Sequence, residues 1–565
     1  AAAAAAVTPY AARAAAASVA AARAAAVTPY ATPAVTPYAA GTPYVGYVPD
    51  FIGRLDDYNA TVGTKFQVND WLTDLSVTTG GNKQIYSVHN SVNRGMAAAF
   101  AAGTSKVQSP TTFQAGGVDF THWVFNGDVS KQVAKDMSVY FGTELRHEKY
   151  EVLAGEFASY TLGGADSYAG NDPANSFAST RSNSGVYAGS TYDISPALVL
   201  EGTGRYEHYS DFGSAFVWKL ASRLKVNDQV TVRASLSTGF RAPSLAQIYT
   251  QKTQYSFVAG SGIQVSGLAN NVSTQAKALN VPQLKAEKSD NFTLGLGIKP
   301  DNNTSMTFDY YNIKLKDRII LGKEIVPSGD PTQQLDQILK AAGIVSLSFF
   351  VNGLDSRTSG LDFVMNRRNI ALGEGKVALN FSGNYTLKNE REGDVKNPST
   401  IAKAGQSVLD QTQEALMFTS RPKFKTIFGV DYDLDKVNFS LNNTVFGPTK
   451  FRNAGLDQNL EVVFKTKSVT DFAVNYALAK NMTLAFNINN IFNATPEWHL
   501  QAVNDVAKGN ALLASTAIDP AYNLTAREIQ NNLITFNGRY SGVTYDGSQF
   551  SQLGRMYNLS LNVRF

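Results

Sequence analysis

Apolar and polar residues alternate along most of the chain after residue 60, and this period of two constrains the fold more than any other feature. The C-terminal segment YNLSLNVRF shows it without a break. Its apolar positions are Tyr557, Leu559, Leu561, Val563 and Phe565. Successive side chains of a β-strand point to opposite faces, so such a segment has one apolar and one polar face. The segments QVTVRASLS, VALNFSGNYTL and NMTLAFNIN repeat the pattern, and together they predict an all-β protein.

The predicted strands are joined by connections of two lengths. Eight are tight turns, at Asn69-Asp70, Lys135-Asp136, Ser195-Pro196, Asn227-Asp228, Asp301-Asn302-Asn303, Gly373-Glu374-Gly375, Asp435-Lys436 and Lys480-Asn481. Asn, Asp and Gly tolerate the backbone angles that hairpins need. Other connections are long and polar, at 156–182, 241–285, 319–355, 391–420 and 493–551, and one short exception lies at Ser210–Gly213. Short turns at one end and long loops at the other are typical of a β-barrel of the outer membrane, with apolar residues facing lipid and polar residues facing the lumen.

The eight turns give a strand count. Each turn is flanked by two strands, which makes sixteen, and the terminal strand makes seventeen. A barrel with both ends in the periplasm needs an even number, and large plugged outer-membrane transporters have about 22 strands. We therefore predict a transmembrane antiparallel β-barrel of about 22 strands, with short periplasmic turns, long extracellular loops and five strands upstream of the first one counted.

The first fifty residues differ from the rest of the chain. They are rich in alanine and repeat the segment VTPY three times. An alanine helix over Ala11–Ala26 is one interpretation, because alanine has the highest helix propensity. We favour the interpretation that the side chains of residues 1–50 were not identified, so that this segment stands for a plug or for the first strands. Residues 51–565 are then the barrel.

Composition excludes several classes of function. The chain has no Cys, which excludes disulfides and thiol chemistry. Outside the alanine region no run approaches 18 apolar residues, so we expect no transmembrane helix. The net charge of +4 is too small to indicate a nucleic-acid partner. The five His residues show no ligand-like spacing, and HExxH and phosphate-loop motifs are absent from the sequence. We predict no catalytic residues, no metal site and no cofactor.

The segment STGFRAPSLAQIY, Ser237 to Tyr249, resembles the strand-to-loop signature of TonB-dependent outer-membrane receptors. Four further segments follow the order of that family: GRYEHYSDFG (204–213), LKAEKSDNFTLG (284–295), DYYNIKLKDRI (309–319) and INNIFN (488–493). The segment 338–364 is also similar to the family, and the C-terminal strand with its final Phe resembles the signal that the barrel assembly machinery recognises. The resemblance covers about residues 50–565.

This resemblance implies active import across the outer membrane. In the family a plug domain sits inside the barrel, and its TonB box is pulled by the TonB complex of the inner membrane. Neither plug nor TonB box can be identified in this sequence, and we expect both to be encoded upstream of residue 50. The expected partners are the TonB complex, outer-membrane lipid, the barrel assembly machinery and, in a SusC-like arrangement, a surface lipoprotein.

The loop after the STGFRAPS segment contains the candidate ligand contacts. They are three aromatic and two cationic residues: Arg241, Tyr249, Lys252, Tyr255 and Phe257. Aromatics with cations suit catecholate siderophores or sugars. The alternative is that these residues pack the loop, with Arg241 and Pro243 setting the turn out of the strand. Haem is disfavoured because residues 241–285 contain no His.

Three further patterns are open to more than one interpretation. Asp166 and Asp172 offer oxygen ligands for Ca²⁺, although a solvated loop fits them better. We expect the lumen charges to pair with one another or with the plug; they are Arg205, Glu207, Arg233, Arg367 and Arg368. A helix is predicted in the loop 319–355, capped by Asp330, with the apolar stripe Leu335, Ile338, Leu339 and Ala342 packing the loop on the barrel mouth. A partner-binding helix is the alternative.

Three functions compete at this stage. The leading one is a TonB-dependent importer of a large scarce nutrient, most often a ferric siderophore in this family. A scaffold or receptor role in a larger outer-membrane assembly is the alternative, and a passive porin is the third.

Overall fold

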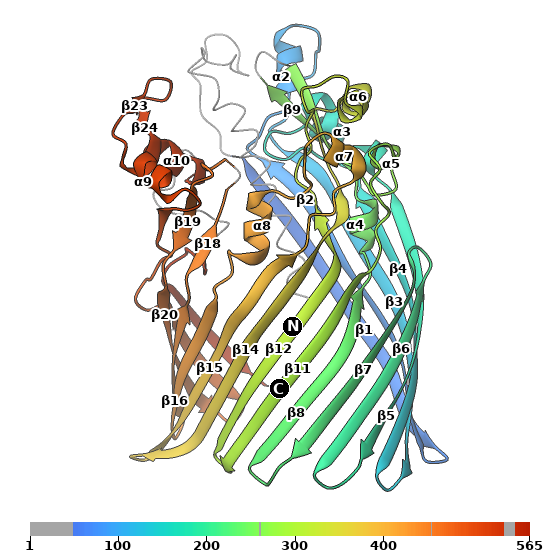
Figure 1. The fold of residues 1–565 in the computed structure, drawn as a ribbon, viewed down its shortest axis with the longest axis vertical. Coiled ribbons are helices and arrows are strands. Elements are labelled where there is room, and N and C mark those ends of the chain that lie inside the picture. The colour runs from blue at the N-terminus through green and yellow to red at the C-terminus, as the bar shows by residue number, and fades with distance from the viewer. Residues whose placement is uncertain (1–48, 259–261, 454, 536–548, 565) are drawn as a thin grey trace.

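The computed structural model describes residues 49–258, 262–453, 455–535 and 549–564. Seventeen of its strands form one antiparallel sheet that wraps around a central space (Figure 1). In order around the sheet they are β1 (Asp50–Val68), β2 (Trp71–His89), β3 (Phe113–Ala134), β4 (Met137–Leu153), β5 (Ala178–Asp193), β6 (Leu198–Tyr209), β7 (Gly213–Lys225), β8 (Val230–Arg241), β11 (Glu287–Asp301), β12 (Thr304–Leu321), β14 (Phe350–Leu372), β15 (Gly375–Glu392), β16 (Phe424–Leu434), β17 (Val437–Phe446), β20 (Lys467–Ala479), β21 (Met482–Asn489) and β25 (Met556–Val563).

All eight predicted tight turns join neighbouring strands of this sheet, at the lower end in Figure 1. Asn69 and Asp70 both have positive φ, 47° and 66°, which is the geometry of the mirror-image turns favoured in hairpins. The short connection at Ser210–Gly213 joins β6 and β7 at the opposite end. The count of seventeen strands made from the turns is therefore confirmed.

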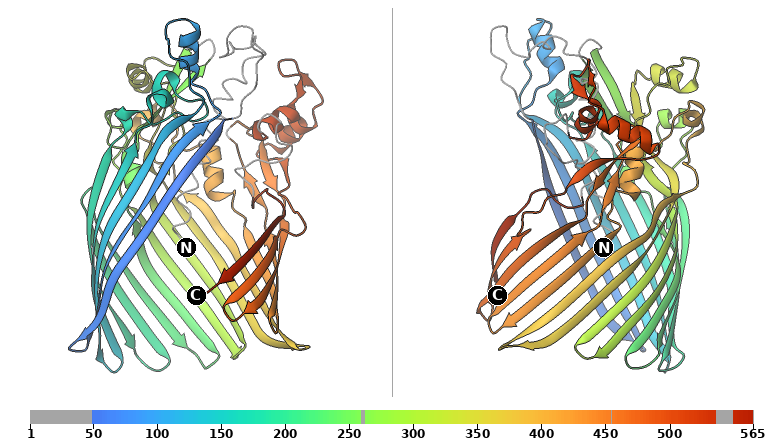
Figure 2. Two further views of the ribbon diagram at one scale, coloured as in Figure 1. Left: turned by 180° about the vertical axis from the view of Figure 1, so that it is seen from behind. Right: turned by 60° about the vertical axis from the view of Figure 1, so that its left-hand side comes forward.

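The sheet has two edges, β1 and β25. Within the described residues β1 pairs only with β2, and β25 pairs only with β21. These two edge strands flank the opening seen from behind (Figure 2). Because all neighbours are antiparallel and the count is odd, β1 and β25 run in the same direction. The five strands expected upstream of β1, and the alanine-rich segment 1–48, lie outside the described residues.

The two faces of the sheet differ as the alternation predicts. Apolar side chains align across strands, for example in the row Tyr557–Ile488–Phe472–Leu441–Val430. Large apolar residues are exposed along this face, with Tyr557 at 64% and Leu559 at 70%. Leu561 and Val563 are exposed as well, whereas Phe565 lies outside the described residues. This face does not cover a protein core, which is the behaviour of a lipid-facing wall.

The remaining elements lie in the loops at the upper end in Figure 1. They are α2 (Arg94–Ala101), α3 (Phe157–Tyr160), η2 (Thr161–Gly163), η3 (Pro173–Asn175), α4 (Leu245–Tyr249), β9 (Lys252–Val258), β10 (Gly262–Leu268), α5 (Thr274–Ala278), α6 (Gln334–Ala341), β13 (Ser346–Ser348), α7 (Ser399–Lys403), α8 (Gln411–Phe418), β18 (Thr449–Phe451), β19 (Leu460–Phe464), β22 (Trp498–Ala502), α9 (Val506–Ala514), β23 (Ile518–Asp519), β24 (Leu524–Thr525) and α10 (Ala526–Ile534). In the described part, none of the helices combines the length and apolar character of a transmembrane helix.

The helix predicted in the loop 319–355 is α6. Leu335 and Leu339 are buried in a cluster with residues of neighbouring loops, and Ile338 packs against the same cluster. The stripe therefore packs the loop as expected at these three residues, whereas Ala342 is exposed. The predicted cap is wrong. Gln333 precedes the helix without a side-chain cap, because the carboxylate of Asp330 accepts hydrogen bonds from the backbone and hydroxyl of Thr332 in the turn before it.

Candidate functional site

Ion pairs cross the lumen face of the sheet over glycine residues. Arg233 on β8 and Asp309 on β12 are separated by the intervening strand β11, yet their side chains meet at 2.6 Å between Nη2 and Oδ2. Gly295 of β11 lies opposite both residues in register. A Cβ atom at Gly295 would lie 2.2 Å from Asp309 Oδ1 and 2.5 Å from Arg233 Nε. The missing side chain is therefore what allows this ion pair to bridge three strands.

Tyrosine rings also lie over glycine residues elsewhere on the lumen face. Tyr187 of β5 extends over Gly142 of β4, and its hydroxyl donates to the carboxylate of Asp128 on β3. Tyr140 of β4 lies over Gly189 of β5 in the same way, and its hydroxyl forms a hydrogen bond with the hydroxyl of Thr203 on β6. These contacts stiffen the wall because each links strands that are not neighbours.

A buried arginine connects the lumen wall to the loop that carries the family-like motif. Arg181 on β5 is only 7% exposed. Its Nε donates to Glu148 Oε2 on β4 over 2.9 Å, and its Nη1 donates to the backbone oxygen of Pro243 over 2.6 Å. Asp211 Oδ2 lies 3.6 Å from the same Nη1. The turn after Arg241 is thus anchored by a charge-assisted hydrogen bond.

The predicted lumen charges mostly pair with one another. Arg205 pairs with Glu207 at 2.5 Å and with Glu144 at 3.4 Å. Arg367 pairs with Asp301 at 2.6 Å near the periplasmic turns, but it lies on the outer face of the sheet, in register with Leu379. Arg368, in contrast, forms no ion pair with any described residue. Pairing within the lumen is therefore confirmed for Arg205 and Arg233. The lumen position predicted for Arg367 is wrong, because the strand register places this residue on the outer face.

Arg241 is held at the end of β8 by Glu287 of β11. The distance between Arg241 Nη2 and Glu287 Oε1 is 2.6 Å, and Glu287 also accepts from the backbone N–H of Ile319. Three residues later Ser244 caps α4 in a capping box with Gln247. These contacts fit the interpretation that Arg241 sets the turn out of the strand.

Tyr249, at the end of α4, packs inside the mouth. Its ring lies 6.3 Å from that of Phe177 and contacts the clusters around Leu245 and Ile248. The next residue, Thr250, shares a hydrogen bond of 3.1 Å with the hydroxyl of Tyr150. Tyr249 therefore serves loop packing in this conformation.

Lys252 lies over the ring of Tyr168, with its Nζ 3.5 Å from the ring centroid. Tyr168 in turn contacts Phe51, at 4.7 Å between centroids. Burial lowers the pKa of Lys252 to about 7 and raises the pKa of Tyr168 to about 12. The backbones of Tyr255 and Phe257 lie in the β9–β10 hairpin, but their side chains are outside the described part.

Sequence analysis missed Arg318, a half-buried residue of β12 at the same mouth. It follows Asp317, whose φ of 56° marks a bulge. Its guanidinium lies 5.9 Å from the centroid of Phe418 and forms no ion pair with a described residue. Near it are Arg241 and Arg421, with Glu287 as the neighbouring carboxylate. The bulge that places Arg318 leaves no trace in the alternation pattern.

The carboxylates considered for Ca²⁺ have other roles. Asp166 pairs with Arg94 at 2.8 Å, and Asp172 accepts from the backbone N–H of Ala174 as the cap of η3. Among the described residues there is no group of three His, Asp or Glu that could hold a metal ion. The loop interpretation fits both residues.

Comparisons with known proteins agree with this architecture. The family model described as TonB dependent receptor-like, beta-barrel matches residues 14–491. Comparison with curated protein sequences gives no match. A mutant of the ferric enterobactin receptor PfeA from Pseudomonas aeruginosa is similar in structure, with a TM-score of 0.56 at 15% identity over 91% of this chain and 62% of that one. Another PfeA mutant, in complex with enterobactin, has a TM-score of 0.56 at 14% identity over 90% of this chain and 62% of that one.

The chain thus spans less than two thirds of the length of these receptors. At such low sequence identity, the structural similarity establishes the shared fold alone. The family model covers most of the chain and therefore establishes the family. The expectation drawn from the STGFRAPSLAQIY segment is confirmed. The protein belongs to the TonB-dependent receptor β-barrel family, whose members are receptors and transporters of the bacterial outer membrane and not enzymes.

Proposed function

We propose that the protein imports a ferric siderophore across the outer membrane with energy from the TonB complex. The observation that carries the proposal is the match of the barrel to this family, supported by the likeness in fold to receptors for ferric enterobactin. Members of the family move cargo that is too large and too scarce for passive diffusion.

The mouth of the lumen suits an anionic iron chelator. Arg241, Arg318 and Arg421 bring three guanidinium groups near one carboxylate, Glu287, so positive charge is in excess there. Guanidinium groups bind oxygen anions with charge-assisted hydrogen bonds. We assign the first ligand contact to Arg318, which lacks a described ion-pair partner.

The candidate residues named from the sequence form a second group of proposed ligand contacts. Tyr249 and Lys252 line the base of the loop, and the β9–β10 hairpin carries Tyr255 and Phe257. Aromatic side chains at these positions would stack on catechol rings once the hairpin closes on the ligand. Stacking is proposed for Tyr249, Tyr255 and Phe257, and a contact through its charge for Lys252.

Closing the barrel requires further strands. Unpaired strand edges are not stable in lipid, because their backbone groups have no hydrogen-bonding partners. β1 and β25 run in the same direction, so an antiparallel barrel closes only with an odd number of additional strands. Five strands upstream of β1 meet this condition and give the 22 expected. We place a plug and its TonB box upstream as well.

Uptake of iron tests the proposal. Cells that express the full-length receptor should accumulate labelled iron supplied as a ferric catecholate, and loss of the TonB complex or collapse of the proton-motive force should abolish accumulation. Uptake that persists without TonB would refute energy coupling. A steady conductance of the purified receptor in planar bilayers would instead indicate a passive pore.

An arginine variant tests the proposed ligand contact of Arg318 at the mouth of the lumen. Replacing Arg318→Gln removes the guanidinium but keeps a similar length, and we expect weaker binding of the anionic chelator by about tenfold, the loss typical of one charge-assisted hydrogen bond. Arg368→Gln is the matched control, since Arg368 lies near the periplasmic end of β14. Equal effects of both changes would contradict the assignment.

A further inference from the structure

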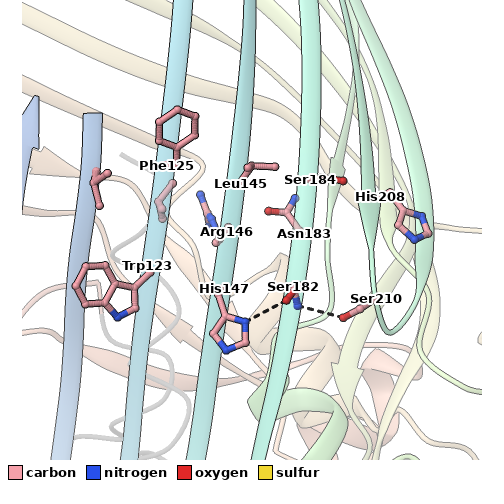
Figure 3. A pocket seen from close by; sticks show the side chains of 12 residues that line it. Trp123, Phe125, Leu145, Arg146, His147, Ser182, Asn183, Ser184, His208 and Ser210 are labelled. Atoms are coloured by element: carbon pink, nitrogen blue, oxygen red, sulfur yellow. Dashed lines mark hydrogen bonds between the residues drawn. The ribbon is translucent and has the colours of Figure 1, made fainter. Parts of the chain in front are cut away.

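The outer wall of the sheet carries a hollow of about 480 Å³ over strands β2 to β6. Nine of its twelve lining residues face outward in two rows, and the other three, Val124, Arg146 and Asn183, lie between them in sequence. The first row contains Val77, Phe125, Leu145, Ser184 and His208. The second row, one step closer to the loops, contains Trp123, His147, Ser182 and Ser210. Figure 3 shows Trp123 and His147 on neighbouring strands, with Ser182 and Ser210 beyond His147.

The hollow lies at the extracellular border of the lipid-facing band. Trp71 marks the other border, where Lys131 lies 5.9 Å from its ring. Thr79, which is opposite Trp123, follows Trp71 by eight residues along β2. Eight residues span about 26 Å of strand, or roughly 20 Å across the membrane for a tilt of about 40°. This is close to the height of the apolar band of an outer-membrane barrel, about 25 Å, with aromatic residues at both borders.

The two rows differ in chemistry. The first row is apolar on β2 to β4, at Val77, Phe125 and Leu145, and ends in Ser184 and His208, whereas the second row offers Trp123 followed by one imidazole and two hydroxyl groups. His147 Nδ1 lies 3.0 Å from Ser182 Oγ, and the N–H of Ser182 donates to Ser210 Oγ over 3.1 Å. Within the described chain, the Nε2 atom of His147 has no hydrogen-bonding partner.

Small side chains on β5 create the depression. Ser182 and Ser184 stand between larger residues, Leu145 and His147 on one side and His208 on the other. A volume of this size accommodates part of a lipid and is many times that of one water molecule, about 30 Å³. An amphipathic molecule fits it best, with chains on the apolar row and a polar headgroup on the second row.

We propose that the hollow binds a phosphorylated glycolipid of the extracellular leaflet, one molecule per receptor. The hollow is continuous with the lipid-facing surface and opens at its extracellular border, so the occupant comes from that leaflet. The hydroxyls of Ser182 and Ser210 and the imidazole of His147 are hydrogen-bonding partners for sugar hydroxyls and phosphate oxygens. Trp123, 58% exposed, covers the side of the headgroup.

Native mass spectrometry of the purified full-length receptor tests this site, with lipopolysaccharide as the probe and phosphatidylglycerol as the comparison lipid. The wild type should retain one lipopolysaccharide in preference to phosphatidylglycerol. Ser184→Phe fills the hollow and His147→Leu removes its donor, and each should lower retention about tenfold, the effect of losing one or two hydrogen bonds. His147→Gln keeps a donor and should restore retention.

Ser190→Phe is the matched control, because Ser190 faces outward on the same strand at a distance from the hollow. It should leave retention unchanged. Equal retention of both lipids by the wild type, or equal loss in Ser190→Phe and Ser184→Phe, would overturn the proposal. Neither outcome depends on whether the receptor imports a siderophore.

Discussion

The ion pair that crosses Gly295 gives the most direct test of how the lumen wall is built. Replacing Gly295→Ala puts a methyl group 2.2 Å from Asp309 Oδ1 and 2.5 Å from Arg233 Nε. Both distances are too short, so the two side chains must separate. Overpacking of this kind costs roughly 1–3 kcal/mol, and a partly exposed ion pair contributes about 0–1 kcal/mol. We expect the free energy of unfolding to fall by about 2 kcal/mol.

The assay is urea unfolding of the full-length receptor in lipid vesicles, followed by tryptophan fluorescence. Gly297→Ala provides the matched control on the same strand and face, because its Cβ would approach only Thr231 O, at 3.8 Å. We expect Gly297→Ala to unfold as the wild type does. If both variants lose the same stability, the intrinsic cost of alanine in this strand explains the result, and the bridging role of Gly295 is refuted.

Three further changes have defined outcomes. Burial lowers the pKa of Lys252 to about 7, so between pH 7 and about 10 the loop binds more protons when it is undocked than when it is docked. Docking of the loop should therefore become more stable as the pH rises through this range. Lys252→Met should abolish this pH dependence, measured by hydrogen exchange of the loop corrected for intrinsic rates. Leu339→Ala, at a residue 1% exposed, should cost about 2–5 kcal/mol within the loop cluster and speed exchange over 334–349 without changing the barrel strands. Asp70→Ala should lower stability by about 1 kcal/mol because φ is 66° there, whereas Asp70→Gly should not, as thermal unfolding would show.

The strands and turns of this fold could be predicted from the sequence because their physical causes are local. The alternation around Leu559 reflects one face in lipid and one in the lumen, and Asn69 and Asp70 tolerate the angles of a tight turn. Every turn found this way joins two strands of the sheet. Parity predicts an odd number of further strands, and the expected total of about 22 makes that number five; this part of the prediction lies outside the described residues.

The loops could be predicted only in part, because their contacts link residues far apart in the chain. Asp330 has the residue type of a helix cap and precedes the helix in sequence. Its carboxylate instead accepts a hydrogen bond from the backbone N–H of Thr332 in the turn before the helix. Lys252 was recognised as a loop cation, yet its position over Tyr168 depends on a second loop. Arg318 owes its place to the bulge at Asp317, which the sequence pattern does not reveal.

The contacts of the STGFRAPS segment explain why a family-like motif need not determine the cargo. Arg241 is held by Glu287, and the backbone of Pro243 is held by Arg181, so both sides of the turn are attached to the lumen wall. The guanidinium of Arg241 and the backbone oxygen of Pro243 are engaged in these attachments and are not free to bind a ligand. What the motif does is to fix the base from which the β9–β10 hairpin extends. Under the proposed function, ligand contacts are then expected from residues outside these attachments, such as Arg318 and the β9–β10 hairpin, so that the anchoring of the turn and the recognition of the ligand are separate.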